Sequence, residues 1–150
     1  SLVEAAEKMP DKSKKAALTK HFNNLMTAVC RWQDNETYLW YNVTDKKGEI
    51  YYQNGDEFIY NIPETSGSAM FSFCLLKGYH TGLLKSEEFR KAGQRAYNSL
   101  TQFKLKDEGL VDILSSSPVT TSEAVYQVSG YVTNDGKGVG PFILATKYAY

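Results

Sequence analysis

One run, from Glu64 to Tyr79, constrains the fold more than any other part of this chain. It opens with small residues, Ser66 to Ala69, and is then apolar on nearly every side. A helix that is apolar all round lies inside a protein. The run therefore predicts an inner helix over about residues 65–79, and Gly78 is placed to end it.

The start of this helix is a candidate ligand site. The first turn of a helix leaves backbone N–H groups without partners and carries the positive end of the dipole, so it can hold a carboxylate or phosphate. The hydroxyls of Thr65, Ser66 and Ser68 would add donors. The alternative is that Thr65 or Ser66 is only an N-cap and that the small residues Gly67 and Ala69 serve helix packing.

Composition narrows the class of protein. A length of 150 residues, 42% of them hydrophobic, is enough for the core of one ordinary domain. Seventeen basic and seventeen acidic residues cancel, so we expect neither nucleic acid nor a membrane surface as a partner. The longest apolar run is too short to span a bilayer. Cys30 and Cys74 each lie on a predicted apolar helix face, which favours free buried thiols, and neither forms a metal-binding pattern with His21 or His80.

Helical periodicity continues on both sides of the inner helix. Residues 1–9 predict the end of a helix, and we expect the first residue to lie within a longer protein. A second helix follows Asp11 or Ser13, and a later one is capped by Ser86. Their apolar stripes are Leu18, Phe22, Leu25, Met26 and Val29, and then Phe89, Ala92, Ala96, Leu100 and Phe103. Helices that repeatedly stop at acidic turns are typical of stacked helical hairpins.

Three segments lack this periodicity. Residues 45–60 are rich in tyrosine, with turns at Lys47–Gly48 and Asn54–Gly55, and predict a small β-hairpin. Residues 113–132 predict a long loop of the kind that is functional or mobile. Residues 134–141 are rich in glycine and predict a loop before a last helix that contains Phe142; their spacing excludes a phosphate-binding loop.

Four motifs together resemble the C-terminal part of glycoside hydrolase family 105, the unsaturated rhamnogalacturonyl hydrolases, which are related to the unsaturated glucuronyl hydrolases of family 88. They are Leu39–Val43, Glu64–Phe71, Leu76–Tyr79 and Asn134–Phe142. The resemblance implies an (α/α)6 toroid, a ring of helical hairpins with about 45 to 50 residues each. We therefore expect an all-α fold, an incomplete toroid of about three hairpins with a short β-hairpin-like excursion. Residues 1–150 would be a single partial domain, the C-terminal portion of the barrel.

The resemblance also implies a reaction. These enzymes act on oligosaccharides, derived from pectin or glycosaminoglycans, that end in a 4,5-unsaturated uronic acid. An aspartate protonates the vinyl ether double bond and directs water onto the neighbouring carbon, and the resulting hemiketal collapses and releases the sugar. No metal, cofactor or covalent sugar intermediate is required.

The catalytic aspartate lies upstream of the matched part in that family, so we assign no catalytic residue here. The turn aspartates are Asp34, Asp45, Asp56, Asp107 and Asp135, and aspartate is the expected residue at turns. We expect the chain alone to be inactive.

The resemblance implies substrate-binding positions as well. Thr65, Ser66 and Ser68 correspond to a segment near the sugar carboxylate, and Lys137 could meet the same carboxylate; the alternative for Lys137 is an exposed loop lysine. Trp40 could stack on a sugar face or pack at a hairpin seam.

Tyr41 has the same two alternatives as Trp40. Gly138 and Gly140 are expected to shape the start of the final helix.

Other functions stay open. The chain could be a non-catalytic helical-hairpin module that binds a carbohydrate or a protein, or a degenerate family member that only binds sugar. A half ring would leave apolar helix faces open at two edges, so pairing with a second copy or with the missing half is expected. By family resemblance, a bacterial cytoplasm or periplasm is the favoured compartment.

Overall fold

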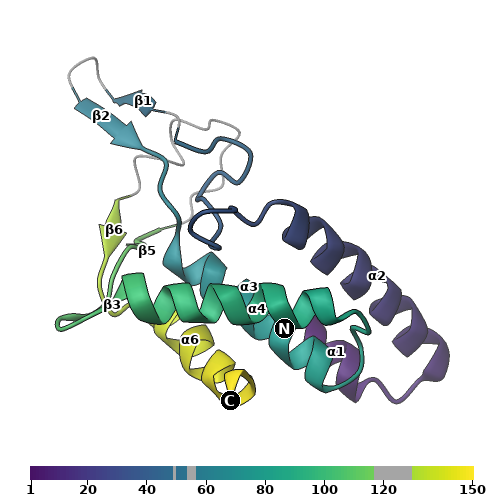
Figure 1. Ribbon diagram of the computed structural model, residues 1–150. Coiled ribbons are helices and arrows are strands. Elements are labelled where there is room, and N and C mark those ends of the chain that lie inside the picture. Colours follow the sequence, from purple (N-terminus) through teal and green to yellow (C-terminus); the bar gives the residue numbers. More distant parts are fainter. Residues whose placement is uncertain (49, 54–56, 117–129) are drawn as a thin grey trace.

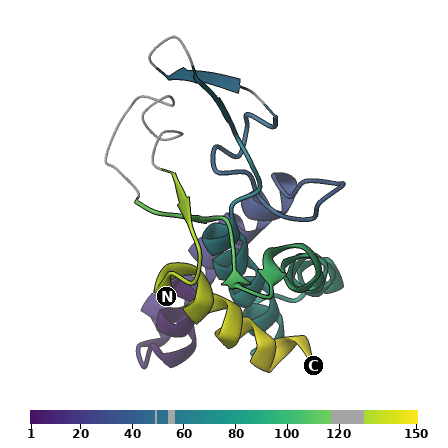
Figure 2. The ribbon, with the colours of Figure 1, turned by 90° about the vertical axis from the view of Figure 1, so that its left-hand side faces the viewer.

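The computed structural model describes residues 1–48, 50–53, 57–116 and 130–150. Its helices are α1 (Leu2–Lys8), α2 (Lys12–Arg31), α3 (Thr65–His80), α4 (Glu87–Ser99) and α6 (Gly136–Ala149), and a π-helical turn, η1 (Leu100–Lys104), follows α4. The strands pair as antiparallel hairpins: β1 (Ile50–Gln53) with β2 (Glu57–Tyr60), β3 (Leu105–Lys106) with β4 (Gly109–Leu110), and β5 (Ile113–Leu114) with β6 (Tyr131–Val132). In Figures 1 and 2 the helices form one body, from which the β1–β2 hairpin stands away.

The first two helices form as the sequence predicts. Pro10 separates α1 from α2, and the Asp11 carboxylate caps α2 by accepting a hydrogen bond from the Lys14 N–H at 2.8 Å. Phe22, Met26 and Val29 are buried. Leu25, which the predicted stripe included, is 47% exposed; it lies at the edge of the stripe, beyond the reach of the core.

The third helix is the centre of the fold. It contacts α1, α2, α4 and α6, which confirms the predicted inner helix. Gly78 does not end it, however, because α3 continues to His80. A Cβ at Gly78 would lie 2.7 Å from Cε1 of Phe22 and 2.8 Å from Cδ1 of Leu84. Glycine is therefore needed there for close packing rather than for a turn.

The fourth helix changes register at its end. Ala92, Ala96 and Leu100 are buried as predicted, but Phe103 is 50% exposed. The N–H of Leu105 bonds to the carbonyl of Leu100, five residues earlier, and this wider turn rotates the following side chains by about one position. Lys104 takes the inward place predicted for Phe103.

The last helix begins earlier than expected. Asp135 caps it, and α6 includes Gly138, Gly140 and Pro141, which the sequence placed in a loop. A Cβ at Gly138 would lie 2.6 Å from Cδ1 of Ile113, so this glycine lets the helix pack against β5. The β1–β2 hairpin is confirmed. The Asn54–Gly55 turn and most of the predicted loop over 113–132, namely 117–129, lie outside the described residues.

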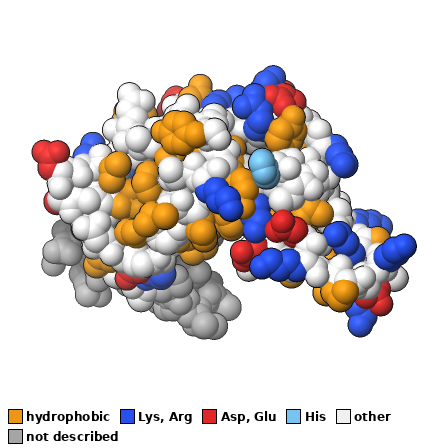
Figure 3. Space-filling view, turned by 90° about the horizontal axis from the view of Figure 1, so that it is seen from below, with side chains coloured by type: hydrophobic (Ala, Val, Ile, Leu, Met, Phe, Trp, Pro, Cys, Tyr) orange, Lys and Arg blue, Asp and Glu red, His pale blue; other side chains and the backbone are white. Residues whose placement is uncertain are grey.

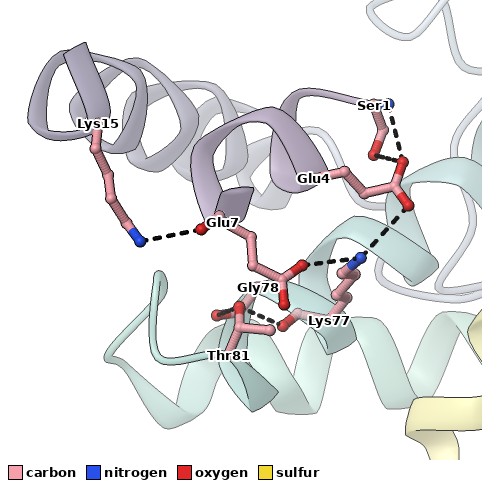
Figure 4. Close-up of polar contacts among 7 residues, drawn as sticks. All are labelled: Ser1, Glu4, Glu7, Lys15, Lys77, Gly78 and Thr81. Carbon is pink, nitrogen blue, oxygen red and sulfur yellow. Dashed lines mark hydrogen bonds and ion pairs between the residues drawn. The ribbon is translucent and has the colours of Figure 1, made fainter. Parts of the chain in front are cut away.

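A buried lysine fastens α1 to α3 (Figure 4). Lys77, on α3, is 6% exposed. Its Nζ lies 3.1 Å from Oε2 of Glu7 and 3.5 Å from Oε1 of Glu4. Burial acts to lower the pKa of Lys77, but the hydrogen bond and charge of Glu7, with the charges of Tyr148 and Glu4, outweigh it and hold the pKa above its usual value.

We expect the double substitution Glu4→Gln and Glu7→Gln to lower the free energy of unfolding by about 2 kcal/mol at neutral pH, because it leaves a buried cation without a carboxylate. This loss in the free energy of unfolding is smaller than that expected for a fully buried ion pair, because both glutamates are partly exposed. Since the pKa of Lys77 is raised in the folded protein, the wild-type advantage should persist at neutral pH and up to pH 10.5, the ordinary pKa of a lysine, and disappear as pH rises through the folded pKa. The advantage should also be lost at acid pH, as pH falls through the lowered pKa of Glu4. Urea unfolding at several pH values measures it.

The control is Glu88→Gln, which removes an exposed pair with Lys91 and should cost less than about 0.5 kcal/mol. Equal losses of unfolding free energy in the two variants would show that the pairing of Lys77 with Glu4 and Glu7 stabilises the protein no more than an exposed ion pair does.

Candidate functional site

The N-terminal end of α3 is capped by Glu64. Its carboxylate accepts hydrogen bonds from the N–H groups of Ser66 (2.8 Å) and Gly67 (2.6 Å) and from the Ser66 hydroxyl (2.7 Å). Glu64 is 6% exposed. The interpretation of Thr65 or Ser66 as the N-cap is therefore wrong. The chain itself supplies a carboxylate to the positive end of this helix.

The hydroxyls predicted at this end of α3 all contact the chain itself. Thr65 Oγ1 donates to the Val111 carbonyl at 2.7 Å, and Ser68 Oγ accepts from the Trp40 N–H at 3.0 Å. Thr65 and Ser68 have no exposed surface, whereas Ser66 is 9% exposed. The Thr65 and Ser68 hydroxyls thus join two distant segments to the start of α3.

Three elements meet at Leu114. Its N–H donates to Oε1 of Glu64 at 3.0 Å, and its carbonyl accepts a hydrogen bond from Nζ of Lys137 at 2.7 Å. Lys137 lies in the first turn of α6 and also donates to the Ser115 carbonyl at 2.8 Å. We call Glu64, Leu114 and Lys137 the Leu114 joint. It brings Lys137 to the end of α3 that carries Ser66.

A second buried ion pair lies close by. Nζ of Lys104 is 2.6 Å from Oδ2 of Asp112, and the Asp112 carbonyl accepts a hydrogen bond from the Thr65 N–H at 3.1 Å. Burial, with the charges of Glu64 and Asp112, raises the pKa of Tyr131 to about 12. No role was predicted from the sequence for Glu64, Lys104, Asp112 or Tyr131. Glu64 has a local signal, a carboxylate directly before the helix; Lys104 has none, because its inward position depends on η1.

Trp40 lies in the core. It is 1% exposed, its Nε1–H donates to the Val29 carbonyl at 2.8 Å, and its ring meets Phe71 edge to face at 5.1 Å. The structure thus places its ring in the packing of the hairpin seam, the second of the two alternatives.

Tyr41 points elsewhere, into a cavity of about 340 Å³ that Asp34 and Lys47 also line. Burial, and then the charge of Asp34, raise the pKa of Tyr41. The structure therefore separates Tyr41 from the Leu114 joint, although its neighbour Trp40 bonds to Ser68.

Asp34 is unsuited to donate a proton. Burial acts to raise its pKa, but hydrogen bonds from Lys47 (2.6 Å), Thr37 and the Glu36 N–H outweigh this and lower the pKa below its usual value. Asp135 is likewise structural, since it caps α6 through the Lys137 N–H. Asp56 lies outside the described residues.

Two further observations apply to the described parts of the chain. They contain no group of three or more His, Cys, Asp or Glu side chains placed to hold a metal ion, and no helix long and apolar enough to cross a membrane. Cys30 and Cys74 are free, as predicted, and half-buried; burial raises the pKa of Cys74 to about 11.

The sequence model of glycosyl hydrolase family 88 matches residues 1–149. The chain belongs to this family. Among solved structures, a family 105 glycoside hydrolase from C. acetobutylicum superposes on this family 88 chain with a TM-score of 0.82 and 32% sequence identity, over 99% of the chain and 42% of that protein.

Two more distant structures share the fold. They are a possible member of family 105 from Salmonella enterica (TM-score 0.74, 16% identity, 98% of this chain and 35% of that one) and a family 88 glycosyl hydrolase from Bacteroides vulgatus (TM-score 0.68, 22% identity, 96% and 38%). These neighbours are (α/α)6 toroids. The predicted fold class, an all-α, incomplete (α/α)6 toroid, is thereby confirmed.

Two sequence relatives match nearly the whole of this chain. Protein Atu3128 of Agrobacterium fabrum and the 24.9 kDa protein in the picA locus of Rhizobium radiobacter are each 29% identical over 161 residues, which is 97% of this chain. The chain spans 65% of the length of these relatives.

Proposed function

We propose that this chain is part of a glycoside hydrolase that releases a 4,5-unsaturated uronic acid from oligosaccharides derived from pectin or glycosaminoglycans. The observation that carries the proposal is the superposition on the family 105 hydrolase, which extends over 99% of the chain at 32% identity. The proposed reaction hydrates the double bond: a proton adds to C4, water adds to C5, and the hemiketal then opens and releases the second sugar. Water supplies both hydrogens and the oxygen.

Residues of this chain would bind the substrate rather than protonate it. We propose that Ser66 and Lys137 face the sugar carboxylate from the Leu114 joint. Thr65, Ser68 and Trp40 would position that end of α3, because they are fully buried and their polar groups bond to the chain itself. Tyr41 would contact a sugar from the separate cavity.

The exposed apolar side chains support the proposal that further hairpins complete the ring in the working protein. Figure 3 shows hydrophobic side chains gathered on one face of the helices. On α6, Ile143 is 62% and Leu144 49% exposed, and on α3 Met70 is 41% exposed. We propose that other hairpins of the toroid, from the same protein or from a second copy, cover these faces.

A chimera would test the proposed reaction. We expect the 150-residue chain alone to show no turnover of an unsaturated uronyl disaccharide, and a fusion with the upstream part of the C. acetobutylicum relative to hydrolyse it. Loss of the double bond's ultraviolet absorbance measures the rate. The saturated disaccharide of the same composition should not be cleaved, because it offers no double bond to protonate.

Within that chimera, Ser66→Ala should raise KM and the exposed Ser13→Ala should leave it unchanged. Cleavage of the saturated disaccharide would point to an ordinary glycosidase with paired carboxylates. Turnover by the chain alone would place the catalytic acid within these residues.

One observation favours a second candidate, a non-catalytic carbohydrate-binding module. The carboxylates described around the start of α3 are engaged, Glu64 with backbone and hydroxyl donors and Asp112 with Lys104. A chimera that binds the unsaturated disaccharide without hydrolysing it would support this candidate.

A further inference from the structure

The cavity beside Tyr41 is a distinct feature of the surface. It lies between the C-terminal end of α2 and the segment that leads to the β1–β2 hairpin, and has a volume of about 340 Å³. Its lining includes Arg31, Trp32 and Asp34 from the end of α2 and the turn after it, and Asp45 and Lys47 from the second segment. A volume of this size accommodates a ligand as small as one sugar ring.

One side of the cavity is held by a network of hydrogen bonds and ion pairs. Oδ1 of Asp34 accepts hydrogen bonds from the Thr37 N–H (2.8 Å) and hydroxyl (2.9 Å), while Oδ2 lies 2.6 Å from Nζ of Lys47. Lys47 also lies 3.0 Å from Oε2 of Glu36. This network ties the two segments that line the cavity to each other, so the lining is preorganised.

The other lining groups are available to a ligand. Trp32 is 53% exposed, although large aromatic rings are usually mostly buried. Arg31 and Asp45 are exposed, and neither forms an ion pair with any residue that the structure describes. An aromatic face, a guanidinium and a carboxylate thus line one hollow. A sugar ring has an apolar face and hydroxyls at its rim, and a uronic acid adds a carboxylate.

We propose that this cavity is a second sugar subsite, which binds a saturated uronic acid residue of an oligosaccharide. The Trp32 indole stacks on the ring, the Arg31 guanidinium pairs with the carboxylate, and the Asp45 carboxylate and Tyr41 phenol bond to hydroxyls. The choice of a sugar as ligand rests on the proposed function. The subsite itself is separate from the Leu114 joint.

Nuclear magnetic resonance provides a test that needs no turnover. The chain has 2 tryptophans, so its spectrum has two indole N–H signals: exposed Trp32, and Trp40, which is bonded to Val29. Titration of the full chain with saturated trigalacturonate should move the Trp32 signal saturably and leave the Trp40 signal in place. Trp32→Ala assigns the signal and should weaken binding, measured by calorimetry, about tenfold.

Arg31→Gln should weaken trigalacturonate about tenfold and leave neutral galactotriose unchanged. The matched controls are Lys20→Gln, an equal loss of charge on an exposed face of α2, and Phe103→Ala, an exposed aromatic outside the cavity; both should bind as wild type. An unmoved Trp32 signal, or binding unaffected by Trp32→Ala, would overturn the subsite.

The two proposals fail separately. If the chimera hydrolyses the unsaturated disaccharide while saturated trigalacturonate leaves the Trp32 indole signal unmoved, the subsite proposal is wrong and the proposed reaction is supported. If Trp32 responds and the chimera does not hydrolyse, the subsite stands as the sugar site of a binding module.

Discussion

Replacing Glu64 with alanine is expected to lower the free energy of unfolding by about 3 kcal/mol. The substitution removes the N-cap of the central helix and leaves the N–H groups of Ser66, Gly67 and Leu114 without their acceptor. These groups are buried or nearly so, and water replaces the carboxylate poorly in such a place. Urea unfolding of the chain, followed by circular dichroism, measures the loss.

Asp11→Ala is the matched control for this prediction. Asp11 caps α2 through one hydrogen bond to Lys14 and is exposed, so its loss should cost only about 1 kcal/mol. Glu64→Gln should fall between the two, because one amide oxygen remains to accept hydrogen bonds. If Glu64→Ala cost no more than Asp11→Ala, the Leu114 joint would contribute nothing beyond a simple helix cap.

The second large effect is expected at Gly93, where α4 crosses α3. A Cβ there would lie 2.9 Å from Cγ of Leu76, 3.0 Å from Cβ of Leu75 and 3.2 Å from the backbone N of Leu76. The Gly93 carbonyl also accepts a hydrogen bond from the Ser72 hydroxyl at 2.9 Å. Gly93→Val should therefore push the helices apart and cost about 3 kcal/mol. Gly93→Ala should cost less, since alanine favours the helix.

Gly136→Ala controls for the loss of glycine itself. Gly136 begins α6, and a Cβ placed there would meet nothing within 4 Å beyond its chain neighbours and the backbone of its own helix. Its substitution should change stability by less than about 0.5 kcal/mol. A stable, fully helical Gly93→Val protein would mean that the crossing of α3 and α4 can widen without loss of core packing.

The helices could be predicted because their signals are local. Asp11 and Ser86 are caps that act on residues next to them, and the stripe of Phe22, Met26 and Val29 has a clear helical period. The small residues before Met70 likewise marked the start of α3. What the sequence could not show were distances between segments.

Three predictions were wrong because they depended on contacts between segments that are distant in the sequence. Gly78 resembles a helix stop, and its packing role depends on Phe22, which is far away in the chain. The inward turn of Lys104 depends on Asp112 and on one wider helical turn. Gly138 was predicted to lie in a loop, but it lies in α6, where its lack of a side chain makes room for Ile113.

At the candidate site, too, the sequence indicated residue types but not the contacts between distant segments. A tryptophan beside a tyrosine suits both a sugar site and a core, and the packing of the Trp40 ring became evident only from its burial and its contacts with Val29 and Phe71. Lys137 was predicted, from the family resemblance, to meet the sugar carboxylate, but its contact with Leu114 required the three-dimensional arrangement. The cavity with Trp32 has no sequence motif, because its lining comes from two separated segments.

The Leu114 joint also bears on how such a chain can change over evolution. Just after the joint, Ser115 and Gly130 are bonded to each other, N–H to carbonyl, at 3.0 Å, and β5 pairs with β6. These bonds hold Ser115 and Gly130 next to each other, directly beside the joint. A substitution that shifts the Leu114 backbone would disturb the cap of α3 and the anchor of Lys137 together, so compensating changes at Glu64, Leu114 and Lys137 are expected to arise jointly.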